Sequence, residues 1–204
     1  MRLDSNFFHN KNSVDLAKDL LWKVITKITS NWVISWIINE VEAYREDDEA
    51  SHTFGWRKSQ RNEVMFKEAW HLYVYFTYGM YYCMNIVSEK SGYGAAVLIR
   101  SVIPYKWVDL MIKNRWKGNI KFEISNNKFT PLIKGARGIL KNLCNWPAKV
   151  CIAYDITKKD NWINLLEDNS IIFLEDVWYK VPEINVSKRI GISKWVEKEW
   201  RFWF

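Results

Sequence analysis

The 204-residue chain is short of cysteine, histidine, proline and glycine. It has only three cysteines and three histidines, and no two cysteines form a C-x-x-C pair. An odd number of thiols without paired spacing argues against both a disulfide framework and a zinc site. The chain therefore needs an ordinary hydrophobic core, which its length and its 49% hydrophobic residues can supply. This composition excludes the disordered, collagen-like and coiled-coil classes.

Signals for export and for membrane insertion are also missing. No apolar segment with a small-residue cleavage site follows Met1, so a cytoplasmic location is expected. Residues 69–88 lack Asp, Glu, Lys and Arg and are long enough to span a bilayer. Five tyrosines and many β-branched residues in this stretch favour buried strands instead, and no membrane association is expected.

The remaining sequence predicts one mixed α/β domain over residues 1–204, without repeats or linkers. Asn12 or Ser13 caps a helix whose apolar spacing continues through Val14, Ala17, Leu20, Leu21, Val24 and Ile25. Further helices are expected at residues 108–113 and at 147–154, where Pro147 suits a first turn. Strands are expected at residues 33–44, 95–103, 170–174, 189–193 and 201–204, and residues 72–87 should form a strand pair, or a strand and a turn, around Tyr78-Gly79.

The strand at residues 33–44 carries the first chemical signal. If it is extended, Glu40, Glu42 and Tyr44 share one face, just before an acidic turn at residues 45–51. A carboxylate there can act as a general base, or it can be the solvated end of an edge strand.

Two weaker signals concern possible ligands. The five tyrosines of residues 73–82 can be core residues or rings that stack on bases. The net charge of +7 suits a surface that faces phosphates, or is a solvated face.

Read in order, these pieces resemble the alkyladenine DNA glycosylase family, the 3-methyladenine DNA glycosylases that excise damaged purines. The resemblance covers roughly residues 13–204 and is densest between Glu40 and Pro104. The segments that carry it are Val41-Glu42-Ala43-Tyr44, Asp48-Glu49-Ala50-Ser51-His52, Arg61-Asn62, Met65-Phe66, Leu72-Tyr73-Val74-Tyr75, Tyr78-Gly79-Met80, Cys83-Met84-Asn85, Val97-Leu98-Ile99-Arg100, Asn114-Arg115, Pro147-Ala148-Lys149, Arg189-Ile190-Gly191-Ile192-Ser193 and Trp200-Arg201-Phe202.

The resemblance implies a role for each matched position. Glu42 falls on the acid that activates a water for attack at C1′ of the deoxyribose, and Arg100 on the arginine that helps to hold that water and the phosphate. Tyr44, His52 and Tyr75 fall on the residues that sandwich an extruded base. The backbone around Ala50 and His52 would meet the Watson–Crick edge of that base.

Four further positions take their roles from the same resemblance. Asn85 falls on the side chain that crowds the 2-amino group of guanine, and Tyr78 on the ring that fills the gap in the duplex. Arg115 and Lys149 fall on contacts to the DNA backbone.

The resemblance further implies a curved, largely antiparallel sheet with surrounding helices and a protruding hairpin. The implied protein is a monomeric, monofunctional glycosylase for duplex DNA that uses no cofactor and no metal. Two rivals are a non-catalytic nucleic-acid-binding module of the same fold and a general RNA binder that uses Lys and Tyr. The first would be favoured if Glu42, Arg100 or Asn85 were missing, and all three are present.

Tryptophan is abundant where glycine is scarce. The chain has 13 Trp and eight Gly, and Asn-Trp pairs at positions 31–32, 145–146 and 161–162 stand where Asn-Gly would signal a turn. The pattern predicts that UGA codons used for glycine were read as tryptophan; the alternative is a surface that is truly rich in tryptophan. The positions where the family pattern calls for glycine are Trp22, Trp32, Trp36, Trp56, Trp70, Trp107, Trp116, Trp146, Trp162, Trp178 and Trp195, whereas Trp200 and Trp203 fit as tryptophans.

Overall fold

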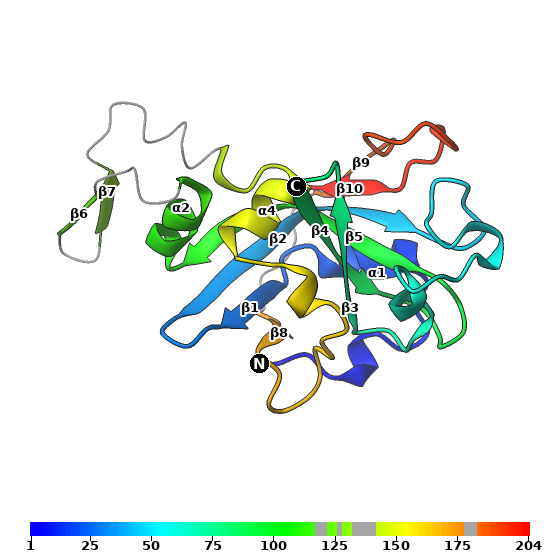
Figure 1. Cartoon of the computed structure of the whole chain (residues 1–204), viewed down its shortest axis with the longest axis horizontal. Coiled ribbons are helices and arrows are strands. Elements are labelled where there is room, and N and C mark those ends of the chain that lie inside the picture. Colours follow the sequence, from blue (N-terminus) through cyan, green and yellow to red (C-terminus); the bar gives the residue numbers. More distant parts are fainter. Residues whose placement is uncertain (117–121, 126–127, 132–141, 178–182) are drawn as a thin grey trace.

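A curled antiparallel sheet organises the protein, as a computed structural model of residues 1–116, 122–125, 128–131, 142–177 and 183–204 describes it (Figure 1). Six strands follow one another in the order β3-β4-β5-β2-β1-β8, and β10 adds to β2 and in turn carries β9. The strand bounds are β1 Val24–Ile28, β2 Val33–Tyr44, β3 Leu72–Thr77, β4 Tyr81–Val87, β5 Ala96–Lys106, β8 Ile172–Glu175, β9 Asn185–Ser187 and β10 Arg201–Trp203. A separate hairpin pairs β6 Phe122–Ser125 with β7 Lys128–Pro131. The mixed α/β fold with a largely antiparallel sheet agrees with the sequence prediction.

The long strand β2 is the centre of the sheet. Along one edge it pairs with β5, and along the other its first half pairs with β1 and its second half with β10. Its pairing with β5 shifts register on both sides of Glu40. Such bulges bend a strand and re-aim its side chains, often next to a functional site. The carboxyl end of β2 is therefore enclosed between β5 and the C-terminal strand.

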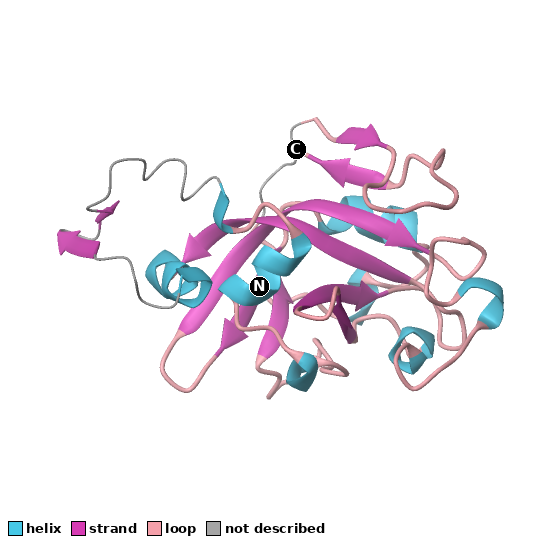
Figure 2. Cartoon of the chain, turned by 45° about the horizontal axis from the view of Figure 1, so that its top comes forward, coloured by secondary structure: helices cyan, strands magenta, loops and turns pink. Residues whose placement is uncertain are grey.

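In the part of the chain that the structure describes, helices α1 Ser13–Leu20 and α4 Pro147–Ala153 pack against the sheet, and α2 Val108–Trp116 packs against α4 (Figure 2). The Asn12 side chain accepts hydrogen bonds from the backbone N–H groups of Val14 and Asp15, so it caps α1 as predicted. Short 3₁₀ turns span Ser5–Phe7, Phe54–Trp56, Glu63–Phe66 and Lys158–Asp160.

Two sequence predictions are wrong in this region. Val24 and Ile25 continue the helical spacing of α1, but they belong to strand β1. A buried strand is apolar on both faces, so its residues can prolong a helical pattern by chance. Residues 189–193 are a bent loop rather than a strand, and the strand there lies just before them, at β9.

Buried apolar residues of α1, α4 and the sheet form the main hydrophobic core. Leu16, Leu20, Ile38, Val41 and Ala43 are each 1% exposed or less. Val41 and Ala43 thus face the core, which leaves Glu40 and Glu42 on the other side of the strand, as predicted.

The charge-free residues 69–88 contain the hairpin of β3 and β4, as the sequence predicted. Leu72 pairs with Ile86 at one end and Thr77 with Tyr81 at the other. The turn carries Tyr78 at φ +51° and Gly79 at φ +66°, and the Tyr78 side chain is 73% exposed. Among the residues that the structure describes, no helix combines the length and the apolar character that crossing a membrane requires.

Six tryptophans have backbone conformations that suit glycine. Only a few per cent of non-glycine residues have positive φ, and a bulky residue there is an outlier. Trp22 is the clearest case, since it follows the end of α1 at φ +67°, where glycine usually ends a helix. The six are Trp22, Trp56, Trp70, Trp107, Trp162 and Trp195, with φ between +47° and +76°.

The other suspected positions lack this feature or lie outside the described residues. Trp36 is a buried strand residue that stacks on Tyr154 with ring centroids 3.6 Å apart, and Trp146 has an extended φ of −158°. Trp32 is not among the residues with positive φ, and Trp116 belongs to α2. Trp178 lies outside the described residues.

Candidate active site

A pocket of about 430 Å³ opens beside the carboxyl end of β2. This volume is within the range of about 300–1,000 Å³ that is typical of small-molecule sites. Most of the predicted site residues meet here, although they come from five separate stretches of sequence. Its lining comprises Tyr44, Ala50, Ser51, His52, Arg61, Met65, Tyr73, Tyr75, Thr77, Tyr78, Cys83, Asn85, Leu98, Arg100, Trp146, Pro147, Ala148, Ile190, Gly191 and Ile192.

Glu42 lies behind the pocket wall and is completely buried. Its Oε1 atom accepts the Ile190 N–H at 2.8 Å and is 3.2 Å from Arg100 Nη1. Its Oε2 atom accepts the Tyr44 hydroxyl at 2.8 Å. All three partner residues line the pocket, so Glu42 is one residue removed from the open space.

The Glu42 carboxylate can still take one more partner. An ionised carboxylate offers about four lone-pair sites, and the three groups described above use three of them. A water that reaches Oε2 beside the Tyr44 hydroxyl could use the fourth. Burial and the nearby Glu42 charge raise the pKa of Tyr44 well above its ordinary value, so this phenol remains a neutral donor.

Arg100 ties Glu42 to a second carboxylate. Its Nε atom donates to Glu40 Oε1 at 3.0 Å, and Arg201 Nε donates to the same oxygen at 2.6 Å. Burial disfavours the Arg100 charge, but the carboxylates of Glu42 and Glu40 outweigh it and raise the pKa of Arg100. Arg100 therefore keeps its charge although its side chain is largely buried.

Aromatic rings form the other side of the pocket. The ring centroids of Tyr73 and Tyr75 are 5.2 Å apart, and His52 meets Tyr75 edge to face at 4.7 Å. His52 Nδ1 lies 2.8 Å from the Tyr73 hydroxyl. Loss of solvent around the ring, and then the Arg61 charge, lower the pKa of His52 to about 4, although part of the side chain is open to solvent. His52 is therefore neutral at pH 7 and can only exchange hydrogen bonds.

Asn85 and Ala50 close the pocket from two other elements. Asn85 is 4% exposed on β4, and its Nδ2 donates to the Tyr73 carbonyl at 3.1 Å, which fixes the direction of the amide. The Ala50 N–H donates to Asp48 Oδ1 at 3.1 Å. A contact between Ala50 and a ligand would therefore have to come from its carbonyl or its methyl group.

Three other predicted site residues lie toward the outside. Tyr78 lines the pocket from the exposed turn between β3 and β4. Arg115 on α2 and Lys149 on α4 are not in the pocket lining, but Lys149 directly follows the lining residues Pro147 and Ala148. Lys149 donates to Asn145 Oδ1 at 2.8 Å. The structure thus gathers most of the predicted site residues in one pocket and leaves these two cations beyond it.

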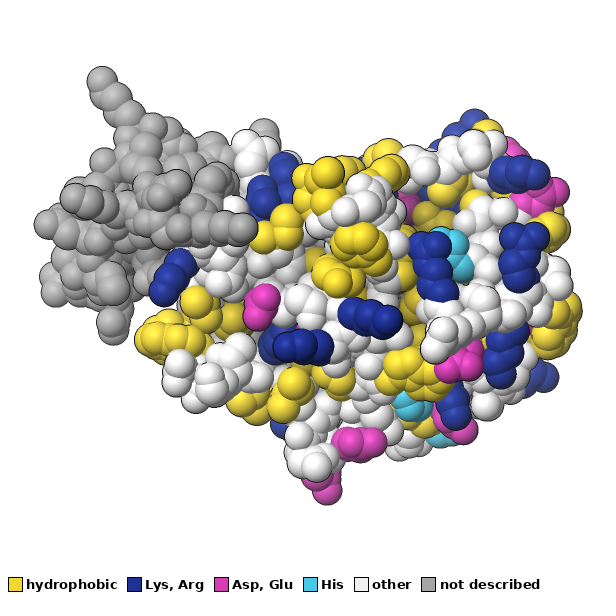
Figure 3. All heavy atoms as spheres, viewed as in Figure 1, with side chains coloured by type: hydrophobic (Ala, Val, Ile, Leu, Met, Phe, Trp, Pro, Cys, Tyr) yellow, Lys and Arg dark blue, Asp and Glu magenta, His cyan; other side chains and the backbone are white. Residues whose placement is uncertain are grey.

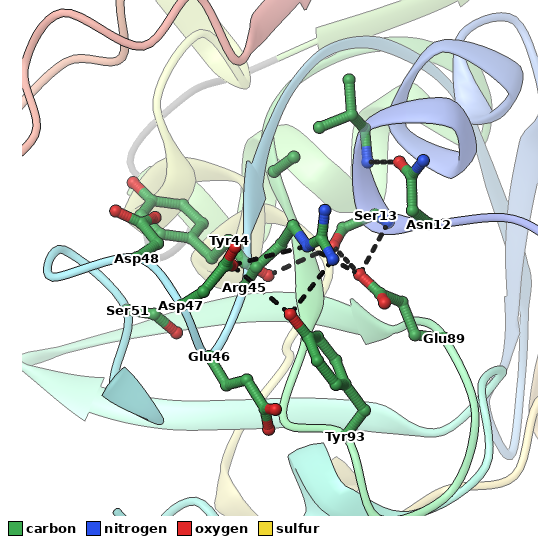
Figure 4. Close-up of polar contacts among 12 residues, drawn as sticks. Asn12, Ser13, Tyr44, Arg45, Glu46, Asp47, Asp48, Ser51, Glu89 and Tyr93 are labelled. Atoms are coloured by element: carbon green, nitrogen blue, oxygen red, sulfur yellow. Dashed lines mark hydrogen bonds and ion pairs between the residues drawn. The ribbon is translucent and has the colours of Figure 1, made fainter. Parts of the chain in front are cut away.

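Three carboxylates of the acidic loop after β2 have cationic partners, one inside the loop and two from the segment after β9. Asp47 is 3.6 Å from Arg45, Glu49 is 3.1 Å from Lys194, and Asp48 pairs with Arg189. Figure 4 shows Arg45 turned toward Glu89 and Tyr93, with Asp48 on the opposite side of the view. The loop therefore adds little net negative charge beside the pocket.

Residues 189–193 carry part of the family resemblance, but no role in the pocket was predicted for them. Ile190, Gly191 and Ile192 line it, and Gly191 has a φ of +79°. Gly191, one of only eight glycines in the chain, was the sequence feature that could have pointed to this loop. Arg61 was also missed, and it places its guanidinium carbon 5.2 Å from the centroid of the Tyr75 ring.

The face of the molecule in Figure 3 mixes positive charge with apolar groups. Lys and Arg side chains are interspersed there with hydrophobic ones, and acidic side chains are fewer. Phe76, Tyr78 and Met80, at the tip of the β3–β4 hairpin, are 50 to 73% exposed. An exposed apolar tip among cations is suited to a partner with a charged backbone and apolar faces.

Comparisons with known proteins agree on one family. The family model for methylpurine-DNA glycosylase matches residues 6–204. A Clostridium novyi protein named "Putative 3-methyladenine DNA glycosylase" is 39% identical over 200 residues, covering 96% of this chain and 92% of its own length. Proteins of the same name from Clostridium acetobutylicum and Clostridium botulinum (strain Langeland) are each 36% identical, with 96% and 100% of this chain covered and 91% and 95% of their own lengths.

Proposed function

Because the chain belongs to the methylpurine-DNA glycosylase family, we propose that it is a base-excision-repair enzyme for damaged purines in duplex DNA. In this proposal it flips the purine out of the helix, hydrolyses the N-glycosidic bond and leaves an abasic site. 3-Methyladenine is the first expected substrate, and hypoxanthine and ethenoadenine are possible neutral ones. The observation that carries the proposal is the buried Glu42 carboxylate held directly behind a pocket of aromatic rings.

The base would enter between the aromatic side chains. Tyr44 and the pair of Tyr75 and His52 offer rings on which a purine can stack, and stacking with edge hydrogen bonds is how a flipped base is read. Asn85, whose amide is fixed by Tyr73, would crowd the 2-amino group of guanine and so reject guanine. Tyr78 would fill the space that the flipped nucleotide leaves in the duplex.

Hydrolysis would then depend on Glu42. A water bound at Oε2 gives a proton to the carboxylate while its oxygen forms a bond to C1′ of the deoxyribose. The bond between C1′ and the purine nitrogen breaks, and its electron pair leaves with the base. Arg100 would hold the water and an adjacent phosphate while it keeps the carboxylate ionised.

The properties of His52 favour substrates that are already cationic. Positively charged 3-methyladenine leaves as a neutral base and needs no proton. A neutral lesion needs one, and His52, with a pKa of about 4, carries no proton to give at pH 7. We therefore expect methylated purines to be released faster than hypoxanthine.

The test is base release from duplex DNA treated with dimethyl sulfate. We expect free 3-methyladenine and alkali-labile abasic sites to accumulate with enzyme concentration. A gel shift with lesion-containing duplex and with single-stranded RNA separates this proposal from a general RNA binder, which would show no preference for the duplex. Binding without any base release would favour the non-catalytic module.

A further inference from the structure

A buried ion pair joins two walls of the candidate pocket. Arg189 Nη1 donates to Asp48 Oδ2, and Arg189 Nη2 donates to Asp48 Oδ1 at 3.0 Å. Both side chains are completely inaccessible to solvent. Asp48 belongs to the loop that carries Ala50, and Arg189 begins the segment that carries Ile190.

The same two side chains also bind the pocket backbone and one of its rings. Asp48 Oδ1 accepts the Ala50 N–H, and Arg189 Nη1 donates to the Ala43 carbonyl at 3.0 Å. The guanidinium carbon of Arg189 lies 4.7 Å from the centroid of the Tyr44 ring. Arg189 is therefore fixed to the end of β2, to the acidic loop and to a ring that lines the pocket.

One backbone N–H connects the ion pair to Glu42. Ile190 directly follows Arg189, and its N–H is one of the two donors to Glu42 Oε1. Ile190 itself is on an exposed loop whose neighbour Gly191 has a left-handed backbone. A loop of this kind does not hold an N–H in one place without a fixed point, and the buried Arg189 supplies that point.

We propose that the Arg189–Asp48 ion pair positions Glu42 for the reaction, by holding the Ile190 N–H against that carboxylate. This inference rests on the proposed function. Arg189 and Asp48 are positioning residues, because neither would touch the substrate. Lysine could keep the charge of Arg189, but its single ammonium lacks the planar fork that binds Asp48 through two nitrogens while it reaches the Ala43 carbonyl.

The experiment compares single-turnover base release from dimethyl-sulfate-treated duplex by the wild-type chain, Arg189→Lys, Ile190→Pro and the double variant. Ile190→Pro removes the N–H and changes neither side chain of the ion pair. We expect each single variant to lower the rate by about 10²-fold, a loss typical of a small misplacement at a reacting group. The duplex concentration at half-saturation should stay close to the wild-type value. The double variant should be no slower than either single variant, because both act through one hydrogen bond.

A second buried ion pair supplies the control. Lys27 and Asp160 are 3.0 Å apart and 8% and 7% exposed, and neither lines the pocket. Lys27→Met should lower the melting temperature and leave the rate unchanged at temperatures where the variant is folded. If Arg189→Lys shows no cooperative melting, Asp48→Asn takes its place in the same comparison.

The outcomes separate the two proposals. A folded Arg189→Lys chain with the wild-type rate overturns the positioning role, and so do rate losses that multiply in the double variant. If Lys27→Met loses as much rate as Arg189→Lys for a similar loss of melting temperature, the positioning role is also overturned. No base release by the wild-type chain contradicts the proposed function instead.

Discussion

Two exposed tryptophans offer a direct measure of backbone strain in this protein. Trp56 and Trp162 have φ values of +62° and +76°, and their side chains are 65% and 38% exposed. A left-handed conformation costs a non-glycine residue about 1–2 kcal/mol. Glycine relieves this strain but loses about 0.5–1 kcal/mol more chain entropy on folding than alanine does.

The double variant Trp56→Gly/Trp162→Gly should therefore be more stable than the chain as it stands. At their midpoints the two terms differ by about 0.75 kcal/mol per site, or about 1.5 kcal/mol for both. In a domain of this size that corresponds to a rise in melting temperature of about 3–6 °C. Differential scanning calorimetry of both chains measures it.

Alanine at the same two positions is the matched control. Alanine also removes the exposed indole but keeps the Cβ atom and so the strain. Its melting temperature should not exceed that of the starting chain. Equal melting temperatures for the glycine and alanine variants would show that strain is not the cause.

The codons of the gene independently test the hypothesis that UGA codons for glycine were read as tryptophan. Codons for Trp22, Trp56, Trp70, Trp107, Trp162 and Trp195 should be UGA, and those for Trp200 and Trp203 should be UGG. Trp36 is buried and has no positive φ, so only its codon can show whether this tryptophan is a misread glycine. UGG at all these positions would refute the recoding.

Three further predictions concern the pocket. Tyr78→Ala should weaken binding to lesion duplex more than binding to undamaged duplex, because the exposed ring is needed only when a base is out; equal losses of affinity in a titration would make it an ordinary surface residue. Asn85→Ala should allow release of purines with a 2-amino group, measured by chromatography of the released bases, and continued exclusion of guanine would assign that role elsewhere. His52 should titrate near pH 4 by NMR, so that its neutral form stabilises the fold above pH 6.5 and this contribution is lost as the pH falls toward 4. Arg61→Gln should raise that pKa, and an unchanged value would mean that burial alone sets it.

The sequence predicted the pocket better than it predicted the chain path around it. Period-2 alternation placed Glu42 and Tyr44 on one side of β2, and the structure joins them by a hydrogen bond. The bulges at Glu40 leave this pattern intact because they lie before Glu42. Local rules work here since both residues belong to one strand.

Contacts between distant segments could not be predicted in the same way. Arg189 and Asp48 are 141 residues apart, and no periodicity links a loop arginine to an acidic turn. The alternating apolar residues of segment 189–193 predicted a strand. In the structure Gly191 has a positive φ, and the segment is a loop that lines the pocket. Tertiary packing decides both cases.

The most direct test of the account is single-turnover base release by Glu42→Gln, with Glu40→Gln as its control. Both carboxylates bind Arg100, but only Glu42 also binds Tyr44 and the Ile190 N–H at the pocket wall. Glu42→Gln should bind lesion duplex like the wild-type chain and release base about 10²–10⁴-fold more slowly, whereas Glu40→Gln should lose much less. Base release by Glu42→Gln at the wild-type rate would contradict the central claim that Glu42 activates the water.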